Sequence, residues 1–472
     1  MASPQVTSAQ RITAAARLDR LPDSRYIRHL VILLSLGGCF EFYDLFFTAY
    51  IAPALYQGGI YTPTTKDFFG VGFASLIASL FAGMLVGTLL FSRMADRFGR
   101  RSVFSFSLLW YSAATFVMAF QSTATTINLW RFIAGIGIGV EFVTIDAYIS
   151  ELVPKHTRGR AFAFNEFLTF LAVPFVAFVS WLLVPRHLLG LDGWRWVVII
   201  GSLGAIFVWF IRRGIPESPR WLEQHGRQEE ADRAMQEIEE RVRREGKDLP
   251  PPMREPIAEA IGGNEEVSSP RGNWQDIFGR PYRQRTIVLS IFQLFQTLGF
   301  YGFATWAPTF LLSKGVNAPK SLEYTFLMAI ASPFGPLLGR RFADKIERKW
   351  QIAGMATLIA IFGLLFSAQT TAVGVVFFGV LITLSSNWFS FAFHAYQSEL
   401  YPTRIRAQAV GFVYSWSRFG AIVSSFVIAF FLRHYGNAGV FVLIALGMLV
   451  IVLVIGAWGP KTNGLGLEEI AQ

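Results

Sequence analysis

The sequence predicts an all-α membrane protein whose twelve transmembrane helices form two pseudo-symmetric bundles of six. The first reason is composition: 53% of the 472 residues are hydrophobic and only 16% are charged, whereas soluble domains carry about 25% charged residues. The second is that apolar residues form long uncharged runs, such as 103–120 and 440–458. A run of about 18 such residues is long enough to cross a bilayer. The third is a pair of loop motifs that recur at one offset along the chain.

The apolar runs place twelve helices along the chain. We expect them near 29–51, 71–92, 102–120, 126–150, 161–184, 194–212, 284–312, 322–341, 351–369, 372–397, 407–430 and 436–458. The long connection 213–283 separates six helices from six. The expected divisions are therefore an N-terminal segment at 1–28, a first bundle at 29–212, the linker at 213–283, a second bundle at 284–458 and a tail at 459–472.

Two further features concern the linker and the orientation. The stretch Glu223–Glu245 is rich in Glu and Arg with apolar residues at helical spacing, which predicts a short amphipathic surface helix. An even number of spans puts both termini on one side, and most of the 42 Lys and Arg residues fall there. Basic loops stay in the cytoplasm, so we expect a multi-pass protein of the inner (cytoplasmic) membrane with both termini cytoplasmic.

Charge and cysteine content exclude other classes. The net charge of +10 follows from this topology, so we expect no nucleic-acid partner. Cys39 is the only cysteine in the sequence, which excludes an intrachain disulfide. The polar first 28 residues precede a full-length apolar span, so we expect the first helix to be retained and not cleaved as a signal peptide.

Two loop motifs repeat at an offset of 248 residues. Asp96, after the second expected helix, and Asp344, after the eighth, stand in similar basic loops. Glu151 and Glu399 stand in similar Ser-Glu-Leu-x-Pro segments at the same offset. Two separate motifs at one offset indicate a duplicated six-helix unit, which is an organisation found in transporters.

Four motifs together carry a family resemblance over nearly the whole chain. They are Asp-Arg-Phe-Gly-Arg-Arg at 96–101, Pro-Glu-Ser-Pro-Arg-Trp-Leu at 216–222, a glycine-rich helix after Arg131, and Gly-Pro-Lys-Thr-Asn-Gly-Leu at 459–465 followed by Leu-Glu-Glu. In combination they resemble the major facilitator superfamily, in its sugar-porter and organic-ion-transporter branch. The resemblance implies alternating access by rocking of the two halves.

The loop motif departs from the family pattern at three positions. Ser92 and Arg340 stand where the pattern has a glycine, and Glu347 stands at the place of Gly99. The departure at Glu347 predicts looser loop packing in the second half.

Charged residues at helix ends are the predicted cytoplasmic gate. Carboxylates among arginines form ion pairs and also cap helix N-termini. Pairs between the halves would hold the cytoplasmic side closed and break when it opens; the alternative is that they only anchor helix ends. The predicted gate residues are Asp96, Arg97, Arg100, Arg101, Glu151, Arg158, Glu217, Arg220, Asp344, Arg348, Glu399 and Arg406.

The predicted proton site lies in the first helix. Glu41 and Asp44 are three residues apart, so they share one helix face. Two carboxylates in a low-dielectric site repel each other, which favours the protonated form of at least one. In proton-coupled sugar porters a Tyr-Asp pair is similar to Tyr43-Asp44. That resemblance makes Asp44 the proton acceptor and Arg131 its switchable partner, with the choice between Glu41 and Asp44 left open. The alternative is a structural pair in which one carboxylate is permanently bonded to Arg131.

Three positions argue against a sugar as the substrate. Glu166 replaces a glutamine of the sugar porters, Gln293 is followed by Leu294 where they have two glutamines, and the tenth helix has His394 near the place of a binding tryptophan. The substrate-binding candidates are Arg418, Glu166, Asn165, Gln293, Gln296, Tyr301, Trp306, Asn387, Trp388 and His394.

Arg418 is the main evidence for an anionic substrate. A guanidinium inside a span needs an anionic partner and binds a carboxylate bidentately. The Ser-Arg-Phe-Gly setting of Arg418 is similar to that in organic-anion transporters. The alternative is that Arg418 pairs internally with Glu166 or with a gate carboxylate. His394 has the residue type to titrate near neutral pH, or it lines the pore without a proton role.

The sequence therefore predicts a monomeric proton-coupled symporter that imports a small organic acid. Its partners are the substrate, the proton and the bilayer. Alternatives are a sugar, polyol or sugar-acid symporter, proton-driven efflux, and a transporter-like receptor. No nucleotide-binding loop, metal cluster or nucleophile–base motif stands in the sequence, so we expect no enzyme activity, metal or cofactor.

The repeat does not extend to the expected membrane midplane. At the 248-residue offset, Asp44 corresponds to Phe292 and Glu41 to Leu289. Arg131 corresponds to Gly379, Glu166 to Tyr414 and Arg418 to Phe170. The duplication thus predicts a gate in both halves, a proton site in the first half and an anion site in the second.

Overall fold

Helices make up nearly all of the computed structural model, which describes residues 13–207, 214–251, 277–342, 345–401 and 403–462. The first bundle consists of α2 (Arg25–Gln57), α3 (Ala74–Phe98), α4 (Arg100–Met118), α5 (Ala124–Leu152), α6 (Lys155–Leu183) and α7 (Gly193–Ser202). Two small antiparallel hairpins connect helices at one end of this bundle. They are β1 (Lys66–Asp67) with β2 (Gly70–Val71) and β3 (His187–Leu188) with β4 (Leu191–Asp192).

The second bundle repeats this arrangement with more interruptions. It consists of α11 (Arg280–Ala304), α12 (Ala307–Ser313), α13 (Ala318–Ala329), α14 (Phe334–Phe342), α15 (Arg348–Ala368), α16 (Ala372–Glu399) and α17 (Thr403–Trp458). Helix α17 contains two crossings, because Gly436 at φ 62° turns the chain between them. Together the helices make the twelve crossings that the sequence predicts, with α11 and α12 sharing one crossing and α13 and α14 another.

Two expected helices are broken where the sequence predicts continuous ones. The crossing expected at 284–312 ends at Ala304 and restarts at Ala307, where Pro308 occupies the first turn of α12. The crossing expected at 322–341 is interrupted between α13 and α14, around Pro333. Proline has no N–H to donate within a helix, and such breaks persist in membranes when neighbouring helices satisfy the freed groups.

Small residues bring helices of the first bundle into close contact. A Cβ added at Gly87 of α3 would lie 2.1 Å from the carbonyl oxygen of Ile136, and one at Gly139 of α5 would lie 2.3 Å from that of Met84. Only glycine permits this approach, which is typical of packing between membrane helices. The contact fixes α5, the helix that carries Arg131, against α3.

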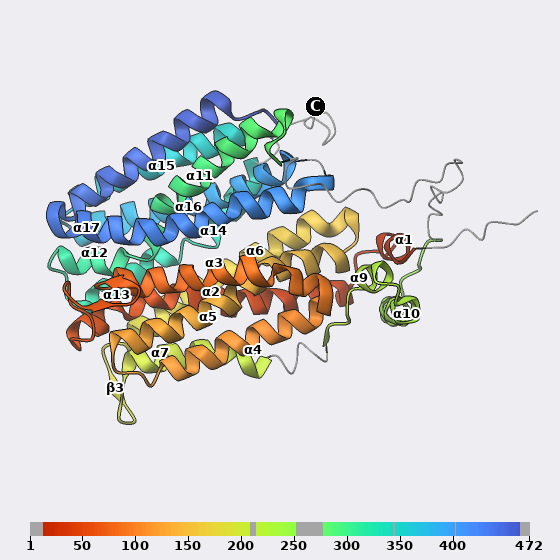
Figure 1. Ribbon diagram of the computed structural model, residues 1–472, viewed down its shortest axis with the longest axis horizontal. Coiled ribbons are helices and arrows are strands. Elements are labelled where there is room, and N and C mark those ends of the chain that lie inside the picture. The colour runs from red at the N-terminus through yellow and green to blue at the C-terminus, as the bar shows by residue number, and fades with distance from the viewer. Residues whose placement is uncertain (1–12, 208–213, 252–276, 343–344, 402, 463–472) are drawn as a thin grey trace, which may run out of the picture.

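Three short helices lie at one end of the molecule, which we call the linker face (Figure 1). They are α1 (Ala14–Asp19), α9 (Pro219–Gln224) and α10 (Gln228–Arg244). The stretch predicted to be amphipathic forms α10, which buries Ala231, Met235, Ile238 and Val242 along one side. These helices pack against each other and, through α9 and α10, against the first bundle.

Aromatic contacts join the two bundles near the end opposite the linker face. Helix α12 packs on α2, α13 on α6, and α17 on α3. Phe73 meets Trp306 with ring centroids 5.8 Å apart, and Phe81 meets Tyr301 at 4.8 Å. Figure 1 shows the orange-to-yellow first bundle beside the green-to-blue second one.

The outer surface of both bundles is apolar. Large side chains such as Phe175, Leu364 and Leu449 are exposed there, and an apolar surface of this extent marks a membrane contact. Among the described residues, seven helices are long and apolar enough to span a membrane. The chain is a multi-pass membrane protein.

Candidate transport site

A buried ion pair joins α2 to α5. The side chains of Asp44 and Arg131 are both fully buried, and the guanidinium donates to Asp44 Oδ1 and to the Asp44 carbonyl oxygen. Thr115 Oγ1 donates to Asp44 Oδ2 at 2.6 Å, and the guanidinium carbon lies 4.4 Å from the centre of the Phe47 ring. The structure therefore brings together the two residues of the sequence-predicted pair.

A polar cavity lies between the two bundles, one helical turn from this pair. Its walls come from α2, α5 and α6 in the first bundle and α11, α16 and α17 in the second. The lining residues are Gly38, Glu41, Phe42, Ile145, Asp146, Asn165, Glu166, Thr169, Phe170, Phe300, Tyr301, Ser390, His394 and Tyr414. Asp146 and His394 come from the last turns of α5 and α16, which end at the linker face. The cavity therefore lies on the linker-face side of the midplane.

Three oxygen atoms of the cavity walls need hydrogen-bond donors. Glu41 Oε1, Asn165 Oδ1 and Glu166 Oε2 are buried, and the described residues give them no partner. Buried polar groups in proteins are normally hydrogen-bonded. The cavity is thus suited to a molecule that brings N–H or O–H groups.

Two phenylalanines separate this cavity from a second one. Phe170 and Phe300 line both cavities, with ring centroids 6.5 Å apart. The second cavity lies farther from the linker face; Tyr50, Met328 and the predicted binding residue Asn387 are among its walls. Asn387 is therefore on the far side of the aromatic partition from Glu41.

Arg418 lies directly behind the cavity wall. It is buried, donates through Nη1 to Tyr301 Oη at 3.1 Å, and lies 4.9 Å from the centre of the Tyr414 ring. Both tyrosines line the cavity. Arg418 and Glu41 are also near enough to interact electrostatically. Glu166, the internal partner considered from the sequence, leaves its Oε2 unbonded.

The predicted glutamines belong to a separate network in the second bundle. Gln293 Nε2 donates to Gln397 Oε1 at 3.0 Å, and Gln296 Nε2 donates to Ser417 Oγ at 2.9 Å. Gln296 also donates to Gln293 Oε1 at 3.3 Å. Neither glutamine is among the lining residues of the polar cavity; through Ser417 the network borders Arg418.

The two predicted tryptophans pack away from the polar cavity. Trp306 is buried against Phe73 and Phe310. Trp388 stacks on Phe342 and donates through its indole N–H to Gln351 Oε1 at 3.1 Å. These contacts place Trp306 at the bundle contact opposite the linker face and Trp388 inside the second bundle.

Two carboxylates of α5 belong to the same region and were missed in the sequence. Asp146 lines the cavity and is exposed to it. Glu141 is fully buried beside Gly37 of α2. The available signal was an acidic residue within an apolar span, which marks a functional position by default.

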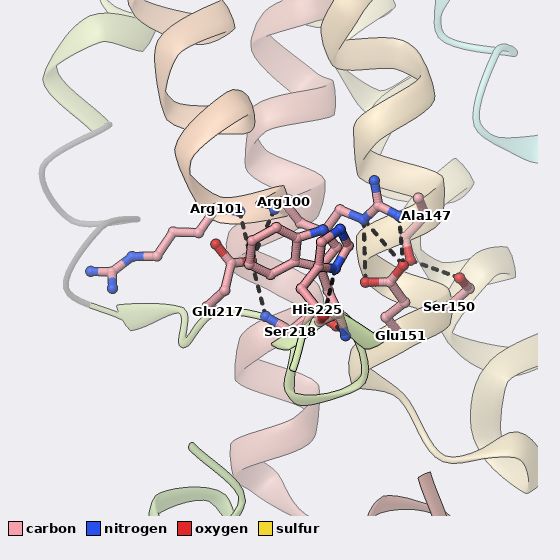
Figure 2. A network of polar contacts seen from close by, with 9 residues as sticks. Arg100, Arg101, Ala147, Ser150, Glu151, Glu217, Ser218 and His225 are labelled. Atoms are coloured by element: carbon pink, nitrogen blue, oxygen red, sulfur yellow. Dashed lines mark hydrogen bonds and ion pairs between the residues drawn. The ribbon is translucent and has the colours of Figure 1, made fainter. Parts of the chain in front are cut away.

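At the linker face, Glu217 ties the segment before α9 to the start of α4 (Figure 2). Glu217 Oε1 accepts hydrogen bonds from the backbone N–H of Arg100 at 2.9 Å and of Arg101 at 3.2 Å. Gly99 turns the chain with φ 94°, and a Cβ there would lie 2.4 Å from Glu217 Oε2. Burial raises the pKa of Glu217, although the N–H groups of Ser218, Arg101 and Arg100 oppose that shift.

The predicted gate pairs that the structure describes lie on one side of the bundle interface. Arg100 binds Glu151 with Nη2 3.0 Å from Oε1, within the first bundle (Figure 2). Arg220 binds Asp19 of α1 at 2.7 Å. Where both side chains of an ion pair are described, the pair does not join the first bundle to the second.

The remaining predicted gate residues make other contacts, or their side chains are outside the described part of the structure. Arg97 lies over the Phe98 ring, and Arg158 reaches the Val153 carbonyl oxygen at 3.5 Å. Arg348 opens α15. Four predicted gate side chains fall outside the described ones: Asp96, Asp344, Glu399 and Arg406.

The second bundle has a tie of its own at Glu347, in the loop for which the sequence predicts looser packing. Glu347 Oε1 accepts the backbone N–H of Thr462 at 2.8 Å. Tyr396 donates to the Pro460 carbonyl oxygen at 2.9 Å, as its counterpart Tyr148 donates to Pro216. The residue that breaks the loop pattern therefore holds the chain that leaves the last helix.

A basic–acidic cluster clamps α1 to α10. Arg17 and Arg20 both bind Glu239, at 3.0 and 2.8 Å. Burial acts to raise the pKa of Glu239, but the two guanidinium groups outweigh it and lower that pKa below its usual value. Glu245 accepts the backbone N–H groups of Arg25 and Tyr26 and so caps α2.

Comparison with known proteins identifies the family. The pattern of the family described as "Sugar (and other) transporter" matches residues 30–472. The chain belongs to this family. Its members are transporters, so the chain is a transporter of metabolites and not an enzyme.

Two bacterial relatives are similar over their whole lengths. A Bacillus subtilis (strain 168) protein named for metabolite transport, YyaJ, is 34% identical over 453 residues, which is 95% of this chain and 96% of YyaJ. The niacin transporter NiaP of Acinetobacter baylyi is 29% identical over 456 residues, covering 96% of this chain and 99% of NiaP.

A solved transporter shares the fold. The xylose transporter XylE from E. coli, in a partially occluded inward-open conformation, superposes with a TM-score of 0.72 at 20% identity, covering 94% of this chain and all of XylE. The twelve-helix, two-bundle architecture is that of the major facilitator fold.

Proposed function

We propose that this transporter is a proton-coupled symporter that carries a small organic acid into the cell by alternating access. In this proposal it acts as a monomer in the inner membrane, with the linker face and both termini in the cytoplasm. The observation that carries the proposal is the buried Asp44–Arg131 pair one turn from a polar cavity. One structure with the same fold is titled a D-xylose–proton symporter, which supports proton coupling.

The proton site works through the competition of two partners for Asp44. While Arg131 contacts the carboxylate, the charged form is stabilised and the proton leaves. When the bundles move and the guanidinium withdraws, the buried carboxylate becomes costly unless it binds a proton. Asp44 therefore takes up a proton in the state open to the outside and releases it in the state described here.

The substrate is an organic acid that also carries hydrogen-bond donors. Arg418 contacts the cavity-lining Tyr301 and Tyr414 and supplies positive charge behind the wall. A modest shift of Tyr301 would allow the guanidinium to bind a carboxylate. Glu41, Asn165 and Glu166 present unbonded oxygens on other parts of the wall. The named substrate of one relative, niacin, is a small aromatic carboxylate and so fits the anionic part of this description, the part that Arg418 would bind.

The second candidate is a sugar, polyol or sugar acid. The observation that favours it is the same set of unbonded acceptors, because hydroxyl groups also supply donors. A fold neighbour carries xylose. Under this alternative Arg418 serves only to compensate the charge of Glu41.

Alternating access accounts for the two unlike ends of the molecule. Aromatic pairs such as Phe81–Tyr301 and Phe170–Phe300 close the path on the side of the cavity that faces away from the linker face. At the linker face, the described pairs Arg100–Glu151 and Arg220–Asp19 lie on the side of the first bundle. Because the aromatic closure lies on the other side of the cavity, we assign the structure to a state whose cavity faces the cytoplasm.

Uptake by proteoliposomes with an imposed inward proton gradient tests this proposal. Radiolabelled nicotinate, benzoate, xylose and xylonate are compared, with gradient-free vesicles as the control. We expect nicotinate or benzoate to accumulate only with the gradient. Arg418→Lys, which keeps the charge but loses the bidentate fork, should raise the Kd for the acid by about 10- to 100-fold. Accumulation of xylose alone, with no effect of Arg418→Lys, would overturn the organic-acid assignment.

A further inference from the structure

Glu141 is a buried carboxyl group that the Asp44–Arg131 mechanism does not use. It lies in the middle of α5, with no exposed surface. Neither of its oxygens has a hydrogen-bond partner among the described residues, and none of the ion pairs of those residues includes it. A group of this kind is expensive to keep in a protein interior, so its presence calls for a role.

The groups around Glu141 are acidic or neutral. From α2, a Cβ at Gly37 would lie 3.0 Å from Glu141 Oε1, and the charges that act on it are those of Glu41 and Asp44. From α4, Tyr111 lies close enough to interact with Glu141, and its hydroxyl is also buried without a partner. The described side chains supply no cation to balance it, so an ionised Glu141 would face two other carboxyl groups in a low-dielectric site.

Glu141 therefore holds a proton in this conformation. An isolated ionised carboxylate in such a site is far more costly than the neutral acid. In the same structure Arg131 is bonded to Asp44, and an adjacent guanidinium favours the charged form of a carboxyl group. The two carboxyl groups thus differ in that only Asp44 has a bonded cation.

A short route connects Glu141 to the cavity. Gly37 and Glu41 are four residues apart on α2 and so lie on one face of it. Glu141 sits beside Gly37, and Glu41 lines the cavity. Tyr111 and Thr115 are likewise four residues apart on α4, so they also share one face of their helix. Thr115 donates a hydrogen bond to Asp44. Glu41 therefore stands between Glu141 and the cavity water.

We propose that Glu141 is a second proton-carrying residue, which exchanges its proton with the cavity through Glu41. In the step itself, the O–H proton of Glu141 passes to the Glu41 carboxylate and from there to water, and no other bond changes. Together with Asp44, this gives two protons per transport cycle. The proposal rests on the proton coupling proposed above, but its first test needs no substrate.

Infrared spectroscopy of the purified wild-type protein at neutral pH tests the protonation and the route. We expect a carbonyl band of a protonated carboxylic acid that disappears in Glu141→Gln. After transfer to D₂O the band should shift, and in Glu41→Gln that shift should slow by about 100-fold, the contribution of a positioned proton-transfer group. Glu323→Gln, on an exposed pair with Lys320, is the matched control and should change neither. A band that survives Glu141→Gln, or exchanges equally fast in Glu41→Gln, would overturn the proposal.

Transport of nicotinate separates a carrier from a permanently neutral group. Glutamine mimics the protonated side chain, so Glu141→Gln should keep counterflow exchange and lose gradient-driven accumulation. Unchanged accumulation in this variant would show that the proton on Glu141 never leaves, and would overturn the carrier role. If the wild type accumulates no nicotinate, the proposed substrate fails, and the D₂O exchange alone decides whether Glu141 communicates with the cavity.

Discussion

At the linker face Glu217 fastens the first bundle and Glu347 fastens the second, but the two carboxylates stand at different places of the repeat. In the first bundle, the segment after the sixth crossing supplies the carboxylate and the loop supplies the backbone N–H groups. In the second, the loop supplies the carboxylate and the segment after the last crossing supplies the N–H. Both bundles therefore have a hydrogen-bonded contact between a loop and the segment that follows the bundle's last crossing, but the donor and the acceptor have exchanged places.

At the level of the cavity the two bundles share no such joint. The first contributes Glu41, Asp44, Glu141, Asp146 and Glu166, with Arg131 as the basic partner of Asp44. The second contributes hydroxyl, imidazole and aromatic groups, namely Tyr301, Ser390, His394 and Tyr414, with Arg418 behind the two tyrosines. The difference teaches that the linker-face joints are retained in both bundles, whereas the buried carboxylates gather in the first bundle, where we propose that protons are carried.

The largest effect is expected from breaking the pair that has no counterpart in the second bundle. Arg131→Met leaves the Asp44 carboxylate buried without a counter-charge, which should cost about 3–5 kcal/mol of stability. Thermal unfolding of the detergent-solubilised protein measures this. The double variant Asp44→Leu/Arg131→Met should recover most of the loss, because well-packed apolar pairs often replace buried ion pairs without penalty. A double variant as unstable as the single one would contradict the assignment of an isolated pair.

A smaller effect should follow from cutting the two linker-face ties. Glu217→Ala removes the acceptor at the N-terminus of α4 and should cost about 1–2 kcal/mol, as for the loss of a helix cap. Glu347→Ala frees Thr462, which lies after the last helix and not at a helix start, so the loss should be smaller, about 0.5–1 kcal/mol. The same thermal unfolding assay ranks the stability losses of the two variants. A larger loss in Glu347→Ala than in Glu217→Ala would contradict the role of Glu217 as a helix cap.

The smallest effect concerns the clamp of α1 on α10, which lies beside the first bundle. The lowered pKa of Glu239 means that its contribution is present above the unfolded-state pKa of about 4.3 and is lost as pH falls through the lower folded-state value. Hydrogen exchange of α1 should therefore accelerate by a few-fold at acid pH, the scale of a partly exposed ion pair. Glu239→Gln should show that faster exchange already at neutral pH, with Glu240→Gln, on an exposed pair with Arg244, as the control. Equal hydrogen exchange of α1 in Glu239→Gln and Glu240→Gln would show that Glu239 does not hold α1 against α10.

Much of this arrangement follows from sequence pattern, because membrane spans and repeats depend on residues that are close in the chain. The twelve crossings and the loop motifs were predicted in this way, whereas the partnership of Asp44 with Arg131 was predicted from the resemblance of Tyr43-Asp44 to the proton-coupled sugar porters. The breaks at Pro308 and Pro333 were not, since membrane helices also tolerate proline without breaking. The tie from Glu347 was not predicted either, because its partner Thr462 is far along the chain and is brought there only by tertiary packing.

The site was predicted less completely than the fold for a related reason. The type of a residue indicates its chemistry, but the rotation of its helix about the helix axis decides whether the side chain points into the cavity. Trp388 faces Gln351 and Phe342 within its own bundle, whereas Asp146, which the sequence analysis did not select, lines the cavity. Rotation of a helix about its axis is set by contacts such as that of Gly139 with Met84, which pattern alone does not give.

The central claim is that proton coupling resides at Asp44 of the first bundle, and the variant Asp44→Asn tests it most directly. The measurement compares gradient-driven uptake with counterflow exchange of the same labelled acid in the same proteoliposomes. The account predicts that Asp44→Asn loses accumulation against a gradient and keeps counterflow, because asparagine fills the site but takes up no proton. Normal accumulation against a gradient in this variant would contradict it.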